Sequence, residues 1–94
     1  MRNVESYAEM RDRVASVATH EPDSQAKAWF IVGPNSKQLA RAEVSLIEYH
    51  ALKNGMLVTV IDDPESTRKA HIVYVAVNGT AAQMVAFTSA MARV

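Results

Sequence analysis

The chain has 94 residues, with ten basic and ten acidic side chains and a formal net charge of zero at pH 7. This balance argues against a protein that coats nucleic acid, because such proteins need surplus Lys and Arg to displace the counterions of the phosphates. The absence of cysteine excludes a disulfide framework, a thiol nucleophile and a cysteine-based zinc site. The length predicts one domain, residues 1–94.

The first predicted element is a helix over residues 4–19, where apolar residues recur at roughly helical spacing. Pro22 predicts that this helix ends near His20, since proline disfavours helical geometry in the residue before it. Residues 1–5 include an acid and no apolar stretch, which is not typical of a signal peptide. Together with the absence of cysteine, this favours a cytoplasmic protein.

A strand is predicted over residues 28–32, whose odd and even positions are both apolar. Such a strand needs cover on both faces. The polar turn after it starts a second helix, with Asn35 as the expected N-cap and Gln38 in the capping-box position, and with Ser36 as the competing cap. The pair Asn54-Gly55 predicts the end of this helix after Lys53.

The second helix carries a broad apolar arc when its residues are placed at helical spacing. The members of this arc are Leu39, Ala40, Ala42, Val44, Leu46, Ile47, Tyr49 and Ala51. Two ionisable residues, Glu43 and His50, fall inside the arc on one stripe.

Residues 56–61 and 72–77 are predicted strands, and residues 81–94 are a predicted last helix. No charged residue occurs from Ile72 to Ala92, and Arg93 is the one charge of the last helix. Polar residues such as Asn78 and Gln83 interrupt this stretch, so we do not expect it to span a membrane. A helix without a charged face is either buried or in contact with another subunit.

The predicted order is helix, strand, helix, strand, strand, helix. The first two strands are expected to run parallel within a β-α-β unit, with the third strand between them. This is an α+β fold with a three-stranded mixed sheet, of ferredoxin-like character but lacking a fourth strand, with an extra N-terminal helix. The second and third helices would cover one sheet face, and the first helix or a second subunit the other.

The apolar content of the sheet and the last helix predicts a homo-oligomer. The first helix is too short to cover a three-stranded face easily. In the last helix, Met84, Phe87, Met91 and Val94 are spaced for packing on another helix. We therefore expect the chain to bind itself through residues 72–94 and the open sheet face.

Glu43 and His50 are a candidate functional pair, because ionisable groups on an apolar stripe shift each other's proton affinity. They lie about two helical turns apart, roughly 10 Å, so a ligand or a third residue would have to bridge them. The competing interpretation places both at the rim of the core.

The turn Gly33-Pro34-Asn35-Ser36-Lys37 is a candidate anion site, because free backbone N–H groups at a helix start bind anions. Lys37 and Arg41 would add positive charge. Ordinary helix capping is the competing interpretation, and the glycine spacing of a phosphate-binding loop is absent.

Metal and cofactor chemistry receive no support from the sequence. Asp62, Asp63 and Glu65 follow a strand beside a proline, which is typical of a solvated turn. The three histidines are widely separated. We expect neither a metal site nor a cofactor, and no catalytic motif is present.

Three functions remain open. The first is a small homo-oligomeric binding or adaptor protein without catalysis, which holds a small anionic ligand or a partner protein near a subunit interface, with Asn35, Ser36, Lys37, Arg41, Glu43, His50 and Trp29 as its binding residues. The second is a cofactor-independent enzyme on a dimeric ferredoxin-like scaffold, with Glu43 and His50 as acid and base. The third is an RNA-binding module that would stack bases on Trp29, Phe30 and Tyr74, against which the zero net charge counts.

Overall fold

A computed structural model describes residues 5–94 of the chain. Its elements are α1 (Tyr7–His20), β1 (Gln25–Asn35), α2 (Lys37–Lys53), β2 (Leu57–Asp62), β3 (His71–Thr80) and α3 (Ala81–Ala92). The strands form one sheet in the order β1-β3-β2, and β3 is antiparallel to both neighbours. The predicted element order, the α+β class and the central place of the third strand are confirmed. The sheet is antiparallel and not mixed as predicted, because β3 lies between β1 and β2 and runs opposite to both. Val4, with which the first helix was predicted to begin, lies outside the described residues.

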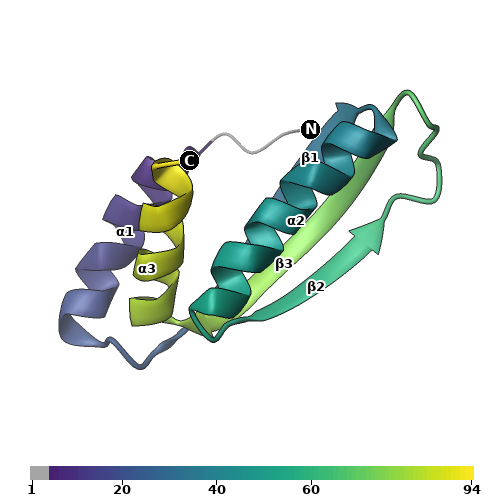
Figure 1. The fold of residues 1–94 in the computed structure, drawn as a ribbon. Coiled ribbons are helices and arrows are strands. Elements are labelled where there is room, and N and C mark those ends of the chain that lie inside the picture. The colour runs from purple at the N-terminus through teal and green to yellow at the C-terminus, as the bar shows by residue number, and fades with distance from the viewer. Residues whose placement is uncertain (1–4) are drawn as a thin grey trace.

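All three helices lie on one side of the sheet. Figure 1 shows α2 lying along the sheet, with α1 and α3 side by side next to it. The aromatic rings of Tyr7 and Phe30 are 5.4 Å apart and those of Phe30 and Phe87 are 5.9 Å apart. These contacts join α1, β1 and α3 in one core. The first helix therefore packs on α3 and does not cross the second sheet face.

Alternate strand residues form the floor of the core. Phe30 and Val32 of β1 and Val75 and Val77 of β3 are almost fully buried beneath the helices. In α2, the buried residues are Ala40, Val44, Ile47 and Ala51, spaced so that they share one narrow stripe of the helix.

The apolar arc predicted for α2 was too broad. Leu39 and Tyr49 are exposed, at 57% and 58% of their surface. Because α2 rests on the sheet with one narrow stripe, apolar residues of the predicted arc that lie outside this stripe reach solvent. The predicted cap was also wrong, since the side chain of Ser36, not Asn35, accepts the hydrogen bond from the Leu39 N–H. The helix ends as expected, at a left-handed Gly55 with φ +76°.

The uncharged C-terminal stretch is largely internal. Met84, Phe87, Thr88 and Met91 of α3 are buried, whereas Val94 is exposed. The Thr88 hydroxyl donates to the Met84 carbonyl at 2.8 Å, which satisfies it inside the core. The apolar face of α3 is thus used within the subunit. None of the helices within residues 5–94 combines the length and apolar character that crossing a lipid bilayer requires.

Candidate binding surface

Within the described residues, the sheet face turned away from the helices exposes several large apolar side chains. Cross-strand partners point to the same side of a sheet, and the register aligns Trp29 with Ala76 and Thr59, and Ile31 with Tyr74 and Ile61. We call this surface the open face; it comprises Lys27, Trp29, Ile31, Leu57, Thr59, Ile61, Ile72, Tyr74, Ala76 and Asn78.

Large side chains of the open face reach solvent. Trp29 exposes 49% of its surface, Leu57 72% and Ile61 48%. Ala76 lies between Trp29 and Thr59 at the centre of this face and is 5% exposed. Within residues 5–94, no helix covers these side chains.

Charged groups of opposite sign mark two corners of the open face. The Lys27 ammonium lies 5.4 Å from the Trp29 ring centroid, close to the start of β1. At the other end, Asp63 follows β2, and its Oδ2 accepts a hydrogen bond from the Tyr74 hydroxyl at 2.8 Å. The hydrogen bonds from the Glu65 N–H and from Tyr74 lower the pKa of Asp63, so this corner carries a negative charge at neutral pH.

The predicted binding residues lie in three separate places. Trp29 is on the open face, while Phe30, its neighbour in the predicted stacking group, points into the core. Asn35, Ser36 and Lys37 lie at the start of α2. Arg41, Glu43 and His50 lie further along α2, on its two flanks.

Much of the hydrogen-bonding capacity at the start of α2 is used within the chain. Asn35 Oδ1 accepts from the Ser36 N–H at 2.9 Å, and Ser36 Oγ accepts from the Leu39 N–H at 3.2 Å. The Lys37 N–H donates to the Arg68 carbonyl at 3.0 Å. The turn therefore acts as a helix cap and as an anchor for the β2–β3 loop, and few backbone donors are left for an anion.

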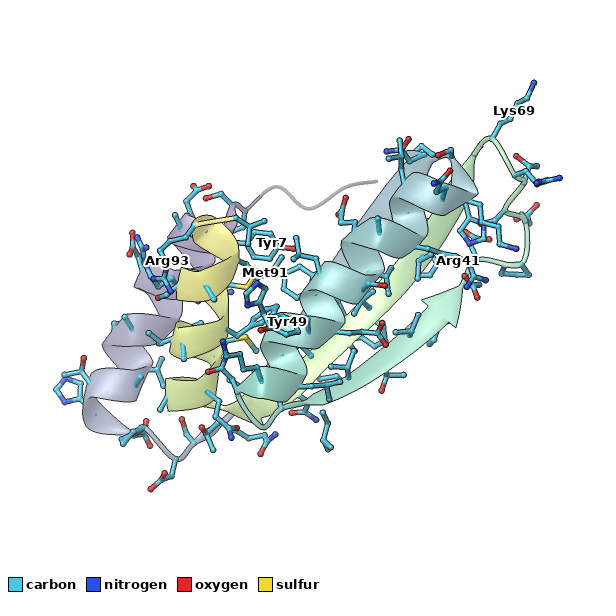
Figure 2. The ribbon with its side chains drawn as sticks, viewed as in Figure 1. Tyr7, Arg41, Tyr49, Lys69, Met91 and Arg93 are labelled. Carbon is cyan, nitrogen blue, oxygen red and sulfur yellow. The ribbon has the colours of Figure 1, made fainter. Side chains whose placement is uncertain are left out.

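Glu43 faces the tyrosine of α1. Burial, followed by the negative charge of Glu43, raises the pKa of Tyr7 to about 12. Figure 2 places Tyr7 and Met91 in the seam between α2 and the other two helices. On α2 itself, the His50 ring packs edge-on against Tyr49, with centroids 5.0 Å apart. Tyr7 is thus the side chain of another element that interacts with Glu43, whereas the ring partner of His50 is its neighbour on α2.

Arg41 lies on the opposite flank, toward β2 (Figure 2). It lines a hollow of about 250 Å³ between α2 and β2, together with Glu48, Asp62, Val60 and others. Both signs of charge are present there, so the hollow is not a simple anion site.

A His–Asp contact beside this hollow was missed from the sequence. His71 Nε2 lies 3.0 Å from Asp62 Oδ1, and the side chains are 11% and 62% exposed. Among residues 5–94, no hydroxyl hydrogen bonds to this pair, so it lacks the nucleophile of a hydrolytic triad. The register across β2 and β3 creates the contact, and no local motif marks it.

The chain is assigned neither a metal site nor a protein family. Within the described part of the chain, no three His, Asp or Glu side chains are grouped as a metal site requires. Comparison of the chain with protein-family models, with curated proteins and with solved structures gives no match. The fold and the open face are therefore the basis for a functional proposal.

Proposed function

We propose that the protein is a small binding protein without catalysis, which acts as a homo-oligomer joined through the open face. The observation that carries this proposal is the exposure of Trp29, Leu57 and Ile61 on a sheet face that no helix within residues 5–94 covers. A sheet of two apolar faces reaches a stable arrangement when each face is buried against another layer.

The energetics favour covering this face. Burying one large apolar side chain contributes roughly 1.5–3 kcal/mol, and the open face offers several. Trp and Tyr are enriched at protein interfaces because they combine a large apolar surface with a polar group; the open face has one of each, Trp29 and Tyr74. These properties favour an interface on the sheet, while most of α3 serves the core of the subunit.

A ligand is the second part of the proposal. A small anion or a partner protein would be held by Lys37 and Arg41, the exposed cations in the first half of α2, on the helix side of the sheet and not at the open face.

The two alternative functions have weaker support. For an enzyme, Glu43 would act beside Tyr7, whose raised pKa keeps its hydroxyl protonated at neutral pH, so that it cannot accept a proton there. For RNA binding, Phe30 is buried in the core and cannot stack on a base. Lys27 is the one basic residue among those of the open face, so little positive charge is available for phosphates.

Sedimentation velocity at high micromolar protein tests the proposal. We expect the unmodified chain to sediment as a dimer or larger, and Leu57→Asp to dissociate it, because a charge would be buried in an apolar contact. The matched control is Leu52→Asp, which changes an exposed leucine of α2 (60% exposed) and should leave assembly unchanged. A monomeric unmodified chain would contradict the proposal. Native mass spectrometry of the same sample reports any bound small molecule.

A further inference from the structure

The two charged corners of the open face are diagonally opposite. Lys27 lies near the start of β1 and pairs with Asn78, whereas Asp62, next to Asp63, pairs with Val73. Asn78 and Val73 lie five residues apart along β3, about 17 Å. The two corners also belong to opposite edge strands, about 10 Å apart across β3. Lys27 and Asp63 of one subunit therefore cannot contact each other.

Two copies of a sheet face can meet in a small number of symmetric ways. Sheets pack either nearly aligned or nearly orthogonal, and a two-fold axis between them must lie in the plane of the contact. An axis along the strands gives aligned sheets and places Lys27 of one copy over Leu57 of the other. An axis across the strands also gives aligned sheets and places Lys27 over Ile31 of the other copy. Both of these corners are uncharged. A diagonal axis gives orthogonal sheets.

The two diagonal axes differ in electrostatics. One places Lys27 over Lys27 of the second copy and Asp63 over Asp63, which brings like charges together. The other exchanges the two corners, so that each Lys27 approaches an Asp63. Electrostatic complementarity of this kind favours one docking register over its competitors.

We propose that the partner on the open face is a second copy of this chain, docked with its strands orthogonal about the diagonal axis that brings Lys27 of each copy to Asp63 of the other. This inference rests on the proposed function, because it specifies the partner and geometry of the same surface.

The neutral residues fit this arrangement. The axis passes over Ala76, the small central residue, and brings Trp29 of one copy over Tyr74 of the other. Thr59 faces Asn78 of the second copy, so a hydroxyl meets an amide.

The two remaining corners, Leu57 and Ile31, lie on the axis and each meets its own counterpart. At these positions, apolar residues thus contact apolar residues and polar residues contact polar ones.

Single cysteines in this cysteine-free chain provide the orientation test. With a short bismaleimide crosslinker, Leu57→Cys should give a covalent dimer, because the two copies of this residue meet. Lys27→Cys should give none, and Leu52→Cys on α2 is the control for random collision. Crosslinking of Lys27→Cys in place of Leu57→Cys would identify the like-charge axis and overturn the inference. No crosslinking at either position in a protein that still sediments as a dimer would indicate aligned sheets and would also overturn it.

A double-mutant cycle tests the charge contact separately. Lys27→Gln and Asp63→Asn should each raise the dimer dissociation constant about three- to tenfold, and the double variant no more than a single one, because either change breaks the same pair. If the double variant raises the dimer dissociation constant by the product of the two single effects, the residues are not in contact. If the unmodified chain is a monomer, the proposed function fails first, and sedimentation distinguishes that result from a wrong orientation.

Discussion

The hydroxyl of Tyr74 donates a hydrogen bond to Asp63 Oδ2 at 2.8 Å, and this bond ties the central strand to the loop that follows β2. Asp63 Oδ1 meanwhile accepts from the Glu65 N–H at 2.9 Å. One carboxylate thus closes its own turn and holds the far end of the open face.

Replacing Tyr74 by Phe should raise the pKa of Asp63, because one of the hydrogen bonds that stabilise its charged form is lost. The value should stay below that of a free Asp, since the larger contribution, from the Glu65 N–H, remains. Titration of the Asp63 carboxyl by NMR measures this. A group with a lowered pKa in the folded state stabilises the fold above its unfolded pKa and loses that effect as pH falls through the folded value. The acid-induced loss of stability that Asp63 contributes should therefore be smaller in Tyr74→Phe, and an unchanged Asp63 pKa would contradict the contact.

Replacing Ser36 by Ala should cost about 1 kcal/mol in the free energy of unfolding, because the Leu39 N–H loses its acceptor at the start of α2. Ser45→Ala, in the exposed middle of the same helix, is the matched control and should be neutral or slightly stabilising. Urea unfolding of the two variants gives the comparison. Equal stability of both variants would show that the cap lies elsewhere, for example at Asn35.

The choice between these caps illustrates what the sequence does and does not determine. Short apolar runs and helical spacing were sufficient for the order of the elements, and the expected β-α-β unit with a third strand between its two strands gave the central place of β3. Asn35 and Ser36 are adjacent and both are good caps, so the choice between them depends on where β1 ends, which is at Asn35. Similarly, Leu39 and Tyr49 are apolar but exposed, because the width of the buried stripe depends on what the helix rests upon.

Local sequence patterns did not predict contacts between residues that are far apart in the sequence. His71 meets Asp62 through the strand register, and Tyr7 faces Glu43 because α1 packs beside α3 and not beneath the sheet. The apolar character of both sheet faces predicts an outside partner for one of them, which stays a prediction, and the pattern alone did not reveal which face the helices leave uncovered. That information came from the burial of Phe30 and the exposure of Trp29.

Replacing Gly33 by Ala should destabilise the fold by about 1–3 kcal/mol. Gly33 has φ +97°, where a Cβ is strained, and a Cβ built there would collide with the His71 carbonyl. Gly55→Ala is the comparison, since its φ is also positive but the nearest atom to the new Cβ is the flexible Gln83 side chain at 3.1 Å. Thermal unfolding should rank Gly33→Ala as the less stable variant. The reverse order would mean that the close approach of β1 to His71 relaxes without cost.

The loss of folding stability at alkaline pH should depend on Tyr7. Its pKa in the folded state is raised to about 12, with burial as the first cause and Glu43 as the second, whereas the unfolded value is about 10. Between these values the unfolded chain loses a proton that the folded chain keeps, so the free energy of unfolding falls as pH rises through this window. Tyr7→Phe should remove this component of the loss of stability at alkaline pH, which urea unfolding at increasing pH measures.

Glu43→Gln should lower the Tyr7 pKa by a smaller amount than exposure of the ring would, because burial is the larger cause. Comparing ultraviolet titrations of the unmodified chain and Tyr7→Phe isolates this tyrosine from Tyr49 and Tyr74. If Glu43→Gln leaves the Tyr7 pKa unchanged, the two side chains do not interact, and Glu43 would then have no partner on α1.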